Sequence, residues 1–98
     1  MFIVSLTYRV PLERIDAAIG EHVAFLNRHY DAGHFLASGR KVPRTGGVIL
    51  ADGLDRDALD RVLAEDPFHR EGLADYEVIE FSPTMARDDI AKAFGMAG

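Results

Sequence analysis

The sequence predicts an α+β fold in which four antiparallel strands form one sheet and the helices cover one of its faces. Three observations indicate this class: a strand-like alternation over residues 2–10, a long helical periodicity after it, and then a strand pair, a shorter helical stretch and a final strand. A chain of 98 residues has room for one hydrophobic core. We therefore expect a single domain over residues 1–98, with its core in residues 2–82 and a short helical tail over residues 85–94.

The first strand and the first helix follow from two different periods. Every second residue of the opening segment is apolar or aromatic, so one face of this strand points to a core: Phe2, Val4, Leu6, Tyr8 and Val10. Pro11 ends the strand. Apolar residues then recur every three or four positions, as in an amphipathic helix: Leu12, Ile15, Ile19, Val23, Leu26 and Tyr30. Gly33 suits the left-handed conformation that follows a helix, so we expect residues 31–33 to close it.

The middle of the chain indicates a hairpin and a second helix. Residues 34–42 are expected to form the second strand and residues 48–51 the third, separated by a turn rich in Pro and Gly. Asp55 is the expected N-cap of a helix that ends before Pro67, and residues 73–82 form the last strand. The resulting order β-α-β-β-α-β is the ferredoxin-like motif, a four-stranded antiparallel sheet with its helices on one face.

The other face of such a sheet stays uncovered. Here it would carry Ile3, either Ile79 or Val78, and several small polar groups. Packing two such faces together would cover these residues. We therefore predict a homodimer with a cleft that is partly lined by the sheet.

Composition and charge exclude several classes of function. The chain has no cysteine, which excludes disulfides, thiolate metal sites and thiol nucleophiles. The net charge is −5, with acidic residues spread along the chain, which argues against a nucleic-acid partner. The apolar stretches are far shorter than the ~20 residues that span a bilayer, and the amino terminus lacks a signal-peptide pattern. We therefore expect a cytoplasmic protein without a membrane partner.

His22 is the strongest candidate for chemistry. On a helical wheel it lies at the edge of the apolar stripe, where a side chain meets both core and solvent. It is either a boundary histidine or a general acid or base, because histidine titrates near physiological pH. His29 lies roughly 10 Å further along the helix, too far for one metal ion to bind both side chains, and no phosphate-binding loop occurs. We therefore expect neither a metal nor a cofactor.

Two carboxylates compete as the partner of His22. Asp66 precedes Pro67 in the pattern of an N-cap before a short helix over residues 67–72, and a carboxylate held there can also orient a histidine. Asp31 lies about 13 Å from His22 along a straight helix, so its pairing needs an early helix end or a contact across a dimer. Both partners stay open on these grounds.

Ser38 and two arginines are candidate ligand contacts. Gly39 follows Ser38 and leaves room for a ligand or for a close backbone approach. No nucleophile elbow surrounds Ser38, so we expect it to donate a hydrogen bond rather than to attack a substrate. Arg9 and Arg40 could hold a carboxylate or a phenolate, or could lie in solvent or in an interface.

Several short segments together resemble the pattern of the YciI-like (YCII-related) family over roughly residues 2–82: His22, residues 31–33, Ser38-Gly39, Asp66-Pro67-Phe68 and Gly72-Leu73. The resemblance implies a ferredoxin-like dimeric α+β barrel with a histidine and an aspartate in its active centre. It also implies enzymes of mostly unassigned reaction, among which one relative acts as a dehydrochlorinase on a chlorinated hydroxyhydroquinone without a cofactor.

Carried over by position, the resemblance makes His22 the catalytic candidate and Asp66 its carboxylate partner. The residues that we expect to contact a small-molecule ligand are Ser38, Arg9, Asp31 and Phe68. The chain departs from the common pattern after Gly39, where many members have proline and this one has Arg40 and Lys41. Two added positive charges point to a different, anionic ligand.

Three hypotheses for the function follow. The leading one is a cofactor-independent lyase or isomerase-type enzyme that uses the histidine and the aspartate to move a proton on a small oxygenated substrate, with a cyclic one favoured. The alternative is a non-enzymatic dimeric module that binds a small ligand or a partner. An oxygenase of the related dimeric α+β barrel type is a third, and the sequence lacks a convincing set of metal ligands for it.

Overall fold

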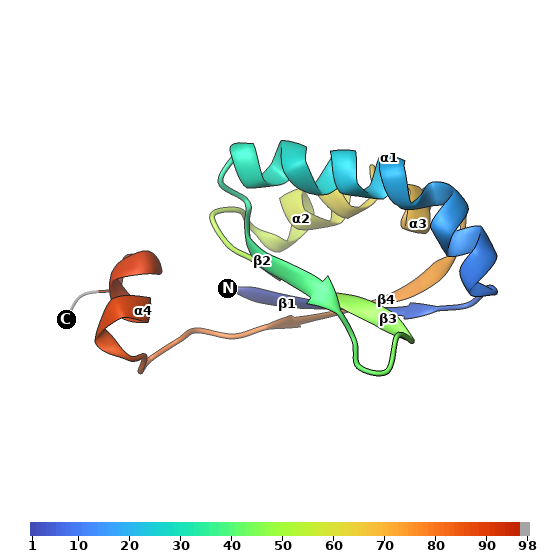
Figure 1. The fold of residues 1–98 in the computed structure, drawn as a ribbon. Helices are drawn as coiled ribbons and strands as arrows, with labels where there is room; N and C mark the ends of the chain where they lie inside the picture. Colours follow the sequence, from blue (N-terminus) through green and yellow to red (C-terminus); the bar gives the residue numbers. More distant parts are fainter. Residues whose placement is uncertain (97–98) are drawn as a thin grey trace.

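The computed structural model describes residues 1–96 and contains one four-stranded sheet (Figure 1). The strands are β1 (Phe2–Tyr8), β2 (Phe35–Arg40), β3 (Gly46–Ala51) and β4 (Ala74–Glu80), in the spatial order β2-β3-β1-β4. Every neighbouring pair is antiparallel. This arrangement confirms the ferredoxin-like α+β class that the element order predicts.

The helices are α1 (Leu12–Asp31), α2 (Arg56–Leu63), α3 (Pro67–Arg70) and α4 (Asp88–Ala93). Figure 1 shows α1, α2 and α3 on the same face of the sheet, whereas α4 stands apart at the end of an extended stretch. Asp55 caps α2 by accepting a hydrogen bond from the Ala58 amide at 2.8 Å, as predicted. Asp66 caps α3 in the same way, with Pro67 in the first turn.

The core lies between the sheet and these three helices. β1 contributes the alternating residues Phe2, Val4 and Leu6, all of which are buried. From the helices, Phe25 of α1 and Phe68 of α3 are also fully buried. Because α1 and α3 pack on the same side of the sheet and against each other, their inward residues join those of β1 in one core cluster.

The buried stripe of α1 differs from the predicted one. Val23 is 45% exposed, whereas Phe25 and His29 are buried. The stripe is therefore rotated toward the side of the helix that carries His22, whose side chain is only 12% exposed. His22 is partly buried and meets both core and solvent, as the sequence predicts, but more of its side chain is covered than a position at the edge of the stripe suggests.

All four strands differ by one or two residues from the predicted limits: β2 covers Phe35–Arg40 within the predicted 34–42, and β4 covers Ala74–Glu80 within the predicted 73–82. β1 ends at Tyr8 instead of Val10. β3 begins at Gly46, where a turn was expected, because Gly46 and Gly47 pair with Thr7 and Leu6 of β1. Both glycines read as turn residues in the sequence, but here they allow two backbones to approach closely.

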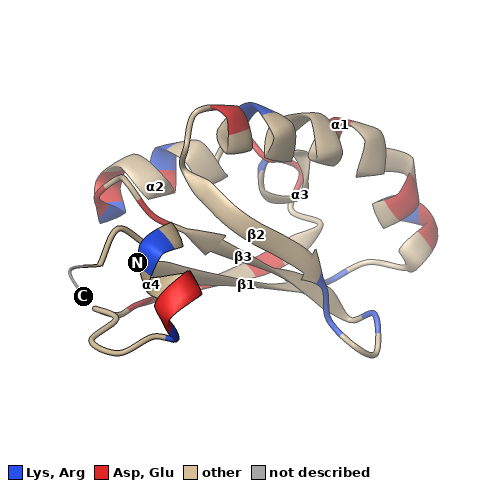
Figure 2. Ribbon diagram, turned by 60° about the vertical axis from the view of Figure 1, so that its left-hand side comes forward, with Lys and Arg blue, Asp and Glu red and all other residues tan. Residues whose placement is uncertain are grey.

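The surface has mixed charge. Figure 2 shows Lys and Arg scattered among acidic residues over the helices and loops, with no continuous basic face in this view. This distribution agrees with the net charge of −5.

Among residues 1–96, no helix is both long and apolar enough to cross a membrane.

Candidate active site

The central feature of the site is a contact between α1 and the start of α3. His22 Nδ1 lies 2.8 Å from Asp66 Oδ1, so the ring N–H donates a hydrogen bond to the carboxylate. Asp31, the other candidate partner, is exposed at the last residue of α1. The structure therefore joins His22 to Asp66, and we refer to these two side chains as the His22–Asp66 pair.

Asp66 is fully buried and accepts hydrogen bonds from three donors. The Phe68 amide donates to Oδ1 at 3.0 Å, and the Tyr76 hydroxyl donates to Oδ2 at 2.5 Å. Together with His22, these groups offset the cost of removing a carboxylate from water. The carboxylate is thereby fixed by a helix, a strand and its own N-cap position at the same time.

The remaining nitrogen of His22 is free. Because Nδ1 carries the hydrogen that Asp66 accepts, Nε2 of the neutral ring presents a lone pair. His22 Nε2 has no hydrogen-bond partner in the protein. Among residues 1–96, Arg44 Nε is the one buried side-chain nitrogen or oxygen without a partner. His22 Nε2 is therefore not buried and keeps contact with solvent. Phe68 holds the ring by stacking, with centroids 4.1 Å apart and planes at 10°. An oriented imidazole with one free nitrogen is suited to accept a proton.

Tyr76 completes the support of the carboxylate from β4. Its burial, then the negative charge of Asp66 and the hydrogen bond to it, raise the pKa of Tyr76 far above its usual value of 10.0. The hydroxyl therefore stays protonated and remains a donor to Asp66. No sequence signal marks Tyr76, because it reads as one more inward residue of an alternating strand.

We expect the contribution of Tyr76 to stability to fade at alkaline pH. Below a pH of 10.0 the hydroxyl is protonated in both folded and unfolded chains, so its contribution is complete. Above this pH only the unfolded chain releases the proton, which favours unfolding by about 1.4 kcal/mol per pH unit. Replacing the residue, Tyr76→Phe, should cost about 1–3 kcal/mol near neutral pH, because Asp66 loses a donor.

Urea unfolding of both proteins at about pH 8 and about pH 11 measures this effect. The gap in unfolding free energy between the wild type and Tyr76→Phe should shrink or reverse at the higher pH. Groups common to both proteins cancel in the comparison. A gap that stays constant would show that the hydroxyl titrates as freely in the fold as outside it.

The other expected ligand contacts are dispersed, apart from Phe68. Ser38 is exposed, and its hydroxyl lies 2.6 Å from the Tyr30 hydroxyl. Arg9 Nε lies 3.6 Å from Asp75 Oδ1, and its side chain is 57% exposed. Within residues 1–96, no hydrogen bond or ion pair joins Ser38, Arg9 or Asp31 to the His22–Asp66 pair.

Two further histidines, His29 and His34, form a cluster with Glu65 near the C-terminal end of α1. His29 Nε2 is 3.0 Å from Glu65 Oε1, and His29 Nδ1 is 3.1 Å from His34 Nδ1. The His29 and His34 ring centroids are 5.4 Å apart. This is close to the largest separation of the ring centres that is possible when the two Nδ1 atoms are 3.1 Å apart. The two nitrogens therefore point at each other along a hydrogen bond. In the described part of the chain, no three His, Asp or Glu side chains are grouped as a metal site would need.

Comparison with known proteins gives a family and a fold. A family model described as the YCII-related domain matches residues 1–82. The chain is also similar to the solved structure of 5-chloro-2-hydroxyhydroquinone dehydrochlorinase from Burkholderia phenoliruptrix AC1100 in complex with 2,5-dihydroxybenzoquinone. The two are 19% identical, with a TM-score of 0.66 over 84% of this chain and 94% of that one. A comparison with curated proteins found no match. At this identity the structural similarity shows the fold alone.

Proposed function

This chain belongs to the YCII-related family, and from that premise we propose that it is a cofactor-independent lyase or isomerase-type enzyme acting on a small oxygenated substrate. In this proposal His22 transfers a proton and Asp66 orients it. The single observation that carries the proposal is the His22–Asp66 hydrogen bond of 2.8 Å, which leaves Nε2 of an otherwise enclosed ring open to solvent.

The pair suits proton transfer for two physical reasons. A buried carboxylate that accepts the Nδ1 hydrogen selects the tautomer in which Nε2 is the base. The same carboxylate stabilises the imidazolium once Nε2 has taken a proton, because its negative charge is fully buried and lies 2.8 Å from Nδ1. An elimination or isomerisation at a carbon next to an oxygen-bearing carbon requires such a base.

The solved relative supports the choice of reaction type. It is named as a dehydrochlorinase, and loss of hydrogen chloride needs a base for the proton while chloride departs with its electron pair. The likeness itself shows the fold alone, so the reaction class is part of our proposal for this chain, and the relative's substrate is not carried over.

A binding module is the alternative, and one observation favours it. The side chain of His22 is 12% exposed and stacked on Phe68, so a substrate has limited access to its free nitrogen. A histidine held in this way can also serve only to fix α1 against α3. In that case the chain would bind a small ligand without converting it.

We also propose that two copies associate through the uncovered face of the sheet. Ile3 of β1 lies opposite Leu50 of β3 and opposite Ile79 of β4, so an apolar row crosses three strands. Ile79 is 47% exposed in the single chain. Docking a second copy would remove this row from water, and sedimentation equilibrium measures the resulting mass.

Turnover with and without the histidine tests the proposed function. The probe is 5-chloro-2-hydroxyhydroquinone under anaerobic conditions, with chloride release as one readout and deuterium uptake from D₂O into the ring of hydroxyhydroquinone as the other. We expect the wild type to accelerate at least one of these steps, His22→Asn to lose about 100-fold or more of that rate, and the control His34→Asn to keep it. A His22→Asn variant as fast as the wild type removes His22 from catalysis, and a wild type inactive in both assays favours the binding module.

A further inference from the structure

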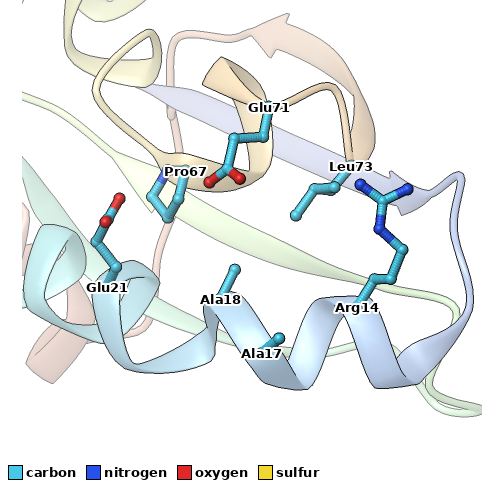
Figure 3. Close-up of a pocket in the computed structure, with 7 residues that line it drawn as sticks. All are labelled: Arg14, Ala17, Ala18, Glu21, Pro67, Glu71 and Leu73. Atoms are coloured by element: carbon cyan, nitrogen blue, oxygen red, sulfur yellow. The ribbon is translucent and has the colours of Figure 1, made fainter.

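A cavity of about 230 Å³ opens between α1 and α3 (Figure 3). Its apolar wall is formed by small or compact side chains, namely Ala17, Ala18, Pro67 and Leu73. Three charged residues, Arg14, Glu21 and Glu71, complete the lining. Figure 3 shows Arg14 at the end of the cavity near Leu73, Glu21 at the opposite end, and Glu71 between them.

Two residues of the cavity lining are neighbours of the His22–Asp66 pair, although the pair itself does not line the cavity. Ala18 precedes His22 by one helical turn, so the two side chains lie on the same side of α1. Pro67 follows Asp66 at the start of α3. A molecule in the cavity therefore occupies the same seam between α1 and α3 that holds the pair.

The charges around the cavity are unevenly neutralised. Arg70 forms an ion pair with Glu21, and its Nη2 lies 3.6 Å from Glu71 Oε2, so one cation serves both carboxylates. Arg14 forms no ion pair within residues 1–96. The cavity thus has a guanidinium available at one end and a carboxylate that is only loosely paired in its middle.

We propose that this cavity binds a small hydroxylated carboxylic acid, with Arg14 receiving the carboxylate and Glu71 accepting a hydrogen bond from the hydroxyl group. The inference rests on the proposed function only in taking this acid to be the substrate. A guanidinium binds a carboxylate through two parallel hydrogen bonds. A phosphate fits less well, because its second negative charge would face Glu71 and Glu21 without a second free cation. The alanine wall suits a flat carbon skeleton.

Amide chemical shifts during titration with 3-hydroxybenzoate test the binding site. We expect saturable shifts at Ala17, Ala18 and Leu73, and binding of the uncharged 3-hydroxybenzamide weaker by about tenfold or more. Arg14→Gln should weaken binding of the acid to the level of the amide. The matched control is Arg61→Gln, which removes another exposed helical arginine, on α2 and away from the cavity, and should leave the affinity unchanged.

Several outcomes would overturn the proposal. These are the absence of saturable binding, shifts confined to residues outside the cavity, equal affinity for acid and amide, or equal effects of Arg14→Gln and Arg61→Gln. The proposed function fails separately: His22→Asn should retain binding of the acid whether or not it affects turnover. Acid binding in a protein that is inactive in both turnover assays would leave the cavity assigned and favour the binding module over the enzyme.

Discussion

Asp66→Ala should abolish turnover and destabilise the fold by about 3–5 kcal/mol, the cost typical of removing one partner from a buried charged pair. Three donors would lose their acceptor at once: His22 Nδ1, the Phe68 amide and the Tyr76 hydroxyl. Each would stay buried or nearly so, which is the costly way to lose a hydrogen bond. Urea unfolding gives the free energy, and chloride release or deuterium uptake gives the rate.

The matched control is Asp55→Ala, because Asp55 is also an N-cap aspartate. It is exposed and accepts one hydrogen bond, from the Ala58 amide. Its loss should cost about 1 kcal/mol and leave turnover intact. If the two variants were equally stable, the buried contacts of Asp66 would contribute nothing beyond ordinary capping.

Asp66→Asn separates the structural role of this residue from its chemical role. The amide can still accept from the Phe68 amide and from His22 through its oxygen, so most of the stability should return. The negative charge that stabilises an imidazolium would be absent, so turnover should stay low. A variant that regains stability and rate together would show that Asp66 acts only as a scaffold.

The order of elements was predictable because each helix and strand has its own period. The alternation in β1 and the Asp66-Pro67 capping pattern of α3 depend on neighbours in sequence, so they can be recognised without a structure. The limits of β3 could not be predicted in the same way. Gly46 and Gly47 are turn residues by type, and only their pairing with β1 places them in a strand.

The residues of the site were partly predictable from local patterns, but the contacts between them were not. His22 and Asp66 stand 44 residues apart, so their hydrogen bond depends on how α3 returns over α1. Tyr76 joins them through the register that sets it opposite Leu6. Arg9 and Arg14 lie close to Pro11 on either side of it in the sequence. In the structure, Arg14 lines the cavity, whereas Arg9 lies beside Asp75. Register and helix packing are long-range properties that no local pattern contains.

Gly46→Ala should be the most destabilising change in the sheet. A methyl group at Gly46 would lie 1.7 Å from the Leu6 carbonyl oxygen and 2.7 Å from its carbonyl carbon. Both are backbone atoms of β1, the strand that pairs with β3 on one side and β4 on the other. Relief of the clash requires β1 and β3 to separate, so we expect a loss of about 4 kcal/mol or more, a large share of the 5–15 kcal/mol that stabilises a typical domain.

Gly39→Ala is the control, since a methyl group there meets nothing within 4 Å and the residue lies in the same sheet. It should change the unfolding free energy by about 1 kcal/mol or less. Urea unfolding compares the two variants, and the yield of folded protein replaces it if Gly46→Ala does not fold. Equal midpoints for both would mean that β1 and β3 are not so close at Gly46.

The effect of Gly46→Ala should also reach the candidate site. Leu6 is opposite Tyr76, so a displaced Leu6 backbone would draw the Tyr76 hydroxyl away from Asp66 and weaken the support of His22.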